Sequence, residues 1–111
     1  MNPLRTLALI LMLGFTTAAT AGAEEEVVIE MIEYQFTPQE VTIKPGTKVR
    51  WVNREKRQYH NIWFKEAGEE PGDYLFPEEE YERVFEESGD YPYVCQPHED
   101  RGMTGRIIVA E

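Results

Sequence analysis

Short runs in which hydrophobic and polar residues alternate make up much of this chain, and this two-residue period is typical of half-buried β-strands. In the clearest run, residues 47–53, Val49 and Trp51 fall on one face and Lys48 falls on the other. Turn residues separate this run from further β-type segments at 27–36, 41–44, 59–64, 78–87, 91–95 and 106–110. Seven or eight short strands predict an all-β fold, either a β-sandwich or a barrel.

Several of these segments have individual features. Residues 27–36 form either one strand or a pair of strand pieces, and 65–77 is rich in Gly, Pro and acids, which indicates a long loop. The spacing within 78–87 fits both a helix and a strand, and we predict mostly strand because a turn at 87–90 follows it. Pro92 lacks an N–H group to donate to a neighbouring strand, so it favours either an edge of the sheet or a position where the amide is unpaired.

The first 23 residues have the features of a cleaved export signal. They combine a cationic start, an apolar run at 7–15 and an A-x-A cleavage site at 21–23. The apolar run is far shorter than the roughly 18–20 residues that cross a bilayer, so we expect no retained membrane anchor. We therefore expect a single folded domain at 24–111, exported to the periplasm. A domain of this size has little room for a deep substrate cavity, which argues against most enzyme classes.

Charge narrows the possible partners. The formal net charge of −10 repels nucleic acid and anionic lipid, which proteins bind mainly through cationic side chains. The charge is also uneven: seven basic residues and one acid, Glu55, lie between Lys44 and Lys65. Between Glu66 and Asp100 there are thirteen acids and one base. These stretches either form solvated strand faces and loops or create an electrostatic field that orients a charged partner. Both interpretations stay open. We expect a monomer.

The candidate chemistry lies around the sole cysteine. Cys95, His98 and Met103 occur within nine residues on a predicted loop, and the only other histidine is His60. Each residue alone has a commoner explanation, since buried thiols and core methionines are frequent. Together, however, a thiolate, two imidazoles and a thioether form the set that binds copper in blue electron-transfer sites. Zinc would normally require a fourth strong ligand in place of methionine.

Three segments carry a resemblance to a known family. These are the pattern Phe36-x-Pro38-x-x-Val41-x-Ile43-x-Pro45-Gly46-x-x-Val49-x-Trp51-Val52-Asn53, the motif His60-Asn61-Ile62, and the loop Cys95-x-Pro97-His98-x-x-x-Gly102-Met103-x-Gly105-x-Ile107-x-Val109. In these segments the chain resembles the cupredoxins, which are type 1 blue copper proteins, and is similar in pattern to plastocyanin and pseudoazurin. The resemblance covers nearly all of residues 27–111.

The resemblance implies a Greek-key sandwich with one copper ion at one end. Its ligands would be His60, Cys95, His98 and, in the axial position, Met103. Asn61 would tie the His60 segment to the ligand loop. Pro97 would matter because it lacks an N–H group that could otherwise donate to the thiolate. The ring edge of His98 would be the exit for the electron.

The resemblance also implies a function. We expect a one-electron carrier that cycles between Cu(I) and Cu(II). Its partner would be a redox protein, such as a basic c-type cytochrome, or a copper-handling protein. The alternative is a periplasmic copper-binding protein that sequesters copper and gives copper tolerance. An enzyme is not expected, because copper enzymes of this fold need further copper centres that two histidines cannot supply. Plastocyanin-like proteins usually carry small or apolar residues after the second histidine, whereas Glu99, Asp100 and Arg101 place charges beside the expected exit.

Overall fold

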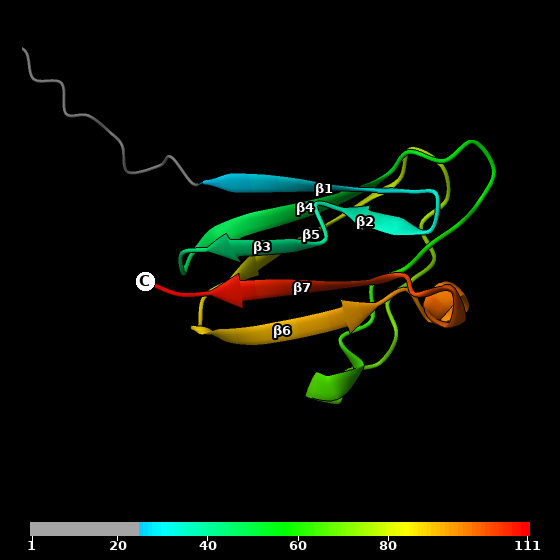
Figure 1. Cartoon of the computed structure of the whole chain (residues 1–111). Coiled ribbons are helices and arrows are strands. Elements are labelled where there is room, and N and C mark those ends of the chain that lie inside the picture. The colour runs from blue at the N-terminus through cyan, green and yellow to red at the C-terminus, as the bar shows by residue number, and fades with distance from the viewer. Residues whose placement is uncertain (1–24) are drawn as a thin grey trace, which may run out of the picture.

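Two β-sheets packed on each other build the protein in the computed structural model, which describes residues 25–111 (Figure 1). The first sheet has the order β2-β1-β4-β5 and consists of β1 (Glu26–Ile32), β2 (Gln35–Thr37), β4 (Thr47–Asn53) and β5 (Glu80–Phe85). The second has the order β3-β7-β6 and consists of β3 (Glu40–Ile43), β7 (Thr104–Val109) and β6 (Gly89–Val94). The predicted all-β sandwich is thus confirmed, while the predicted signal segment at 1–23 lies outside the described residues.

The chain crosses repeatedly between the two sheets. It passes from β2 to β3, from β3 to β4 and from β5 to β6, and each step leads to the opposite sheet. As a result, β1 pairs with β4 and β3 pairs with β7 as parallel neighbours, whereas the remaining pairs are antiparallel. These crossings close one core between segments that are far apart in the sequence.

The strands follow the alternation in the sequence. Along β4, Val49 and Trp51 are completely buried, while Lys48 and Arg50 are only half-buried. The first predicted segment is a pair of strand pieces, β1 and β2, and 78–87 contains strand β5 as expected. Pro92 lies on β6, which is at the edge of its sheet, so this prediction is also confirmed.

The apolar run at 59–64 does not form a strand, which corrects the sequence-based expectation. It makes two isolated bridges, from His60 to Leu75 and from Trp63 to Val94. Because these bridges attach its two ends to different segments, no continuous ladder of backbone hydrogen bonds can form. The run instead links the long loop after it to the end of β6.

An aromatic core lies directly behind the end of the sandwich where this run passes. Trp51 and Tyr93 are buried and meet edge to face, with ring centroids 5.5 Å apart. The Trp51 Nε1–H group donates a hydrogen bond of 3.2 Å to the Tyr93 hydroxyl. Gly105 on β7 pairs with Tyr93, and a Cβ atom at this glycine would stand 2.4 Å from the tyrosine ring. Only glycine therefore leaves room for Tyr93, two residues before Cys95.

Within residues 25–111, no helix is both long and apolar enough to cross a membrane.

Candidate metal centre

The backbone of His60 is fixed by the loop that follows it. The His60 N–H group donates to the Leu75 carbonyl at 3.1 Å, and the Leu75 N–H group donates back at 2.7 Å. The His60 side chain is completely buried. A buried imidazole held by two backbone hydrogen bonds has little freedom to move, so its direction is set by the fold.

The other candidate residues lie on one loop that is closed by its own backbone. Cys95 follows β6, and the 3-10 segment η3 (Gln96–Arg101) begins directly after it, at the opposite end of the sandwich from the C-terminus (Figure 1). The Cys95 N–H group donates to the Met103 carbonyl at 3.0 Å, and the His98 N–H group donates to the Cys95 carbonyl at 3.0 Å. Gly102 has φ of 80°, a left-handed conformation that suits glycine and turns the loop back into β7.

Three of the four predicted ligands come together. The Cys95 Sγ atom lies 3.7 Å from His60 Nδ1 and 3.4 Å from His98 Nδ1, and the two Nδ1 atoms are 3.2 Å apart. Bond lengths of about 2.0 Å to nitrogen and 2.3 Å to sulfur place trigonal ligand atoms about 3.5–3.8 Å apart. The spacing of the three atoms is therefore close to that of ligands around one ion.

Met103 is placed beside this group by its backbone. Its carbonyl accepts the Cys95 N–H group, and its own N–H group donates to the His98 carbonyl at 3.3 Å. The methionine side chain is completely buried. The predicted axial ligand thus belongs to the same hydrogen-bonded loop as Cys95 and His98.

The protonation of the site follows from burial. Desolvation raises the pKa of the Cys95 thiol above its ordinary value of 9.0, against the opposing effect of backbone N–H groups of Asn61 and His98. Desolvation also lowers the pKa of His98, and the nearby His60 ring lowers it further. Without a metal, the group at neutral pH therefore consists of a protonated thiol and a neutral His98 imidazole with a free lone pair.

Asn61 connects the two segments that supply the donor atoms. Its N–H group points at the Cys95 sulfur at 3.4 Å, and its side-chain oxygen accepts the Gln96 N–H group at 2.7 Å. Its side-chain amide also donates to the Gly72 carbonyl at 3.0 Å. Pro97 lies near the start of η3, where a proline is readily accommodated because the first N–H groups of a helix have no partner within it. Asn61 therefore hydrogen-bonds the His60 segment to the loop that carries Cys95.

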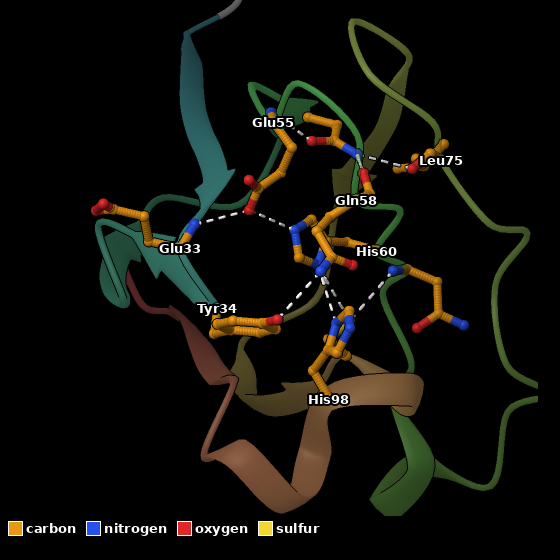
Figure 2. Close-up of polar contacts among 10 residues, drawn as sticks. Glu33, Tyr34, Glu55, Gln58, His60, Leu75 and His98 are labelled. Carbon is orange, nitrogen blue, oxygen red and sulfur yellow. Dashed lines mark hydrogen bonds and ion pairs between the residues drawn. The ribbon is translucent and has the colours of Figure 1, made fainter.

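Glu55 is a contact that the sequence interpretation missed. One of its carboxylate oxygens lies 2.9 Å from His60 Nε2 and accepts the Glu33 N–H group at 2.7 Å (Figure 2). The Glu55 side chain is only 15% exposed. Its position as the one acid between Lys44 and Lys65 was the available signal, but nothing in that pattern identified the histidine as its partner.

The surface beside His98 is aromatic. His98 is half-buried, and its ring packs against Tyr34 with centroids 4.9 Å apart and lies 6.3 Å from Tyr59. Tyr59 continues to the exposed side chains of Tyr74 and Phe76, at centroid distances of 4.6 Å and 5.7 Å. We call Tyr59, Tyr74 and Phe76 the aromatic cluster.

Two of the three charged residues that follow His98, the expected exit for the electron, contact other side chains of the protein. Glu99 forms an ion pair with Lys65 at 2.6 Å, and the Arg101 guanidinium stacks over the Tyr34 ring at 4.3 Å. The sequence indicated the charges correctly but not these contacts, because each depends on a residue more than thirty positions away. The surroundings of His98 thus include both aromatic rings and charged groups.

Known proteins share these features. Residues 23–110 match the sequence model of a family described as copper binding proteins, plastocyanin/azurin family. The amicyanin of Paracoccus versutus is 42% identical over 97 residues, a match that covers 83% of this chain and 70% of that protein. The chloroplastic plastocyanin of Tetradesmus obliquus is 36% identical over 107 residues, covering 86% of this chain and 73% of the relative.

The similarity extends to the fold. The crystal structure of the amicyanin from Paracoccus versutus aligns with this structure at a TM-score of 0.68 and 36% identity, covering 79% of this chain and 83% of that one. The group of His60, Cys95 and His98 supplies the donor types that a single type 1 copper requires. The chain therefore belongs to the plastocyanin/azurin family of copper binding proteins.

Proposed function

We propose that the protein is an exported one-electron carrier whose copper ion is held by His60, Cys95, His98 and the axial Met103. The observation that carries this proposal is the convergence of one sulfur and two imidazole Nδ1 atoms within 4.8 Å of one another. When bound there, copper would supply the Cu(I)/Cu(II) couple. The soft thiolate favours Cu(I) and the imidazoles suit both oxidation states. The weak axial thioether adds an electron pair that the more highly charged Cu(II) needs more than Cu(I) does.

The protein's own contribution is to keep the donor atoms still. His60 is held by Leu75, and Cys95 is held by the Met103 carbonyl and by Asn61. A site whose ligands are fixed in advance rearranges little when its charge changes, and this favours electron transfer. Such a protein acts as a carrier and needs no substrate pocket, which supports a non-enzymatic role.

The half-buried His98 is the proposed route for the electron. Its ring is the donor group nearest to solvent, since His60 and Cys95 are completely buried. The aromatic cluster continues from His98 across the surface and would let a partner approach closely. The acidic stretch at 66–100 supports a basic partner, such as a c-type cytochrome, which it would orient by charge.

The location follows from the first 23 residues, which we propose to be a signal peptide that exports residues 24–111 to the periplasm. Mass spectrometry of the protein recovered from a periplasmic fraction tests this directly. A chain that begins at Glu24 is the expected species, and an uncleaved cytoplasmic chain would contradict export.

A spectroscopic experiment tests the copper site. Copper(II) added to the purified protein is expected to give an intense visible thiolate-to-copper band and the corresponding EPR signal, and Cys95→Ala is expected to abolish both. A colourless copper(II) form of the wild type would contradict the site.

A kinetic experiment separates the carrier from the alternative role in copper sequestration. Stopped-flow mixing of the reduced protein with an oxidised c-type cytochrome should show rapid electron transfer that slows as salt is added. A deletion strain that grows normally except in excess copper, together with slow transfer to every cytochrome tried, would favour sequestration instead.

A further inference from the structure

The Glu55 carboxylate occupies a position that the carrier function described above does not use. It stands on the side of the His60 ring opposite the cluster of donor atoms: Nε2 faces Glu55 at 2.9 Å (Figure 2), while Nδ1 faces His98 and the Cys95 sulfur. Glu55 is thus in contact with a proposed ligand but not with the position of the ion itself.

Several hydrogen bonds build this position. The Glu55 N–H group donates to the side-chain oxygen of Asn53 at 2.8 Å, and Asn53 is completely buried. The Asn53 amide in turn donates to the carbonyls of Gln58 and Leu75, at 3.0 Å and 2.8 Å. Leu75 is the residue whose backbone holds His60, so one network fixes both the imidazole and its carboxylate.

The contact from Glu33 secures the carboxylate from the other side. Glu33 lies in the turn between β1 and β2, with φ of 56°, and its N–H group donates to the same Glu55 oxygen that faces His60. A carboxylate oxygen that receives hydrogen bonds from two directions and is largely shielded from water is held in one orientation.

We propose that Glu55 is the positioning residue of the copper centre, which selects the tautomer and direction of His60; this inference rests on the proposed copper function. The Glu55 oxygen that faces His60 Nε2 at 2.9 Å already accepts the Glu33 N–H group, so it acts as an acceptor and places the ring proton on Nε2 when Nδ1 binds the metal. The lone pair is then on Nδ1, the nitrogen that faces the Cys95 sulfur. A carboxylate partner also makes the imidazole a more basic ligand.

The Glu55 carboxylate should therefore affect the relative stability of Cu(II) and Cu(I) in the site. A more basic imidazole beside a negative charge stabilises Cu(II) more than Cu(I), because Cu(II) carries the larger charge. Removal of such a hydrogen-bonded partner typically lowers metal affinity about 10–100-fold. We therefore expect Glu55→Ala to weaken Cu(II) binding about tenfold or more and Cu(I) binding less.

Two variants separate the two effects of Glu55. In Glu55→Gln, the amide oxygen can still accept the Nε2–H group while the negative charge is lost, whereas Glu55→Ala removes both. Glu30→Gln is the matched control, because Glu30 loses the same charge but pairs with Arg54 rather than with a histidine.

The first measurement uses the metal-free protein. Nitrogen NMR of the His60 ring, recorded at a pH where the ring is neutral, should show the Nε2–H tautomer in the wild type, in Glu55→Gln and in Glu30→Gln, and a mixture of tautomers in Glu55→Ala. A pure Nε2–H tautomer in Glu55→Ala would overturn the proposal, and this result does not depend on whether copper binds.

The second measurement uses the copper-loaded protein. Both Glu55 variants should have a higher midpoint potential than Glu30→Gln, with a shift of about 59 mV for each tenfold change in the ratio of Cu(II) to Cu(I) affinity. Potentials equal to that of Glu30→Gln would overturn the proposal. If the wild type bound no copper, the proposed function would fail, while the tautomer experiment would still decide the role of Glu55.

Discussion

Among single residues, Cys95 shows how burial couples protonation to metal binding. The thiol has a raised pKa and is protonated at neutral pH, whereas a metal ligand must be the thiolate. Copper binding should therefore release one proton from Cys95, and none from His98, whose lowered pKa already makes it neutral.

The expected result is an apparent copper affinity that rises about tenfold for each pH unit between about pH 7 and 8. Competition titrations against a chelator with known pH dependence measure this slope, and calorimetry in buffers of different ionisation enthalpy counts the proton. An affinity that does not change with pH would show that the thiol is already ionised.

The proposed axial ligand, Met103, can also be tested by a single substitution. Met103→Leu should keep the visible thiolate-to-copper band, because the three close donor atoms remain, and should raise the midpoint potential, because a weak donor to Cu(II) is lost. Spectroscopy and voltammetry measure both properties.

Met31→Leu is the matched control for this variant, since Met31 is equally buried but lies in strand β1. It should leave the potential unchanged. If Met103→Leu behaved in the same way as Met31→Leu, the axial assignment would be wrong.

The elements differ in how far the sequence predicted them. The strands were predictable because alternation is a local property, and β4 keeps the predicted faces in the structure. The segment at 59–64 was not, because its bridges to Leu75 and Val94 depend on chain crossings that alternation does not encode. The same distinction applies to the site: a thiolate, imidazoles and a thioether are rare enough to identify, whereas Glu55 is one acid among many until the fold places it beside His60.

The close packing of strand β7 against Tyr93 can be tested by mutation. Gly105→Ala should lower the free energy of unfolding by about 1–3 kcal/mol, because the new methyl group would overlap the buried Tyr93 ring. Chemical denaturation of the metal-free protein measures the change.

Arg106→Ala, at the exposed neighbouring position, is the control and should change stability by no more than about 0.5 kcal/mol. Equal effects of the two substitutions would show that the core accommodates the methyl group by moving Tyr93. In that event a shift of the copper band would also be expected, since Tyr93 lies on the strand that leads to Cys95.

At the scale of the whole molecule, the aromatic cluster and the acidic stretch should act on different steps of partner binding. Phe76 is 50% exposed and lies on the aromatic cluster that extends from His98. Phe76→Ala should lower the rate of electron transfer to a c-type cytochrome several-fold at every salt concentration, because the lost contact is apolar. Stopped-flow kinetics at low and high salt measure this.

Val84→Ala is the control for the loss of an exposed apolar side chain. Val84 is 42% exposed and pairs with Lys48, near the opposite end of β4 from Asn53. It should leave the rate unchanged, while added salt should slow the wild type and both variants in the same proportion. Equal rates for Phe76→Ala and Val84→Ala would place the docking surface elsewhere.

The separation of 35 positions between His60 and Cys95 also determines when the ion can be acquired. Cys95 and His98 are neighbours in any conformation of the chain, but His60 reaches them only after the Trp63–Val94 bridge and the sandwich around it have formed. The complete donor set therefore becomes available only once the chain has folded, so insertion of copper into the full site follows folding. If the polypeptide crossed the membrane unfolded through a translocon, it would arrive without copper. The ion would then have to be supplied in the compartment where the chain folds.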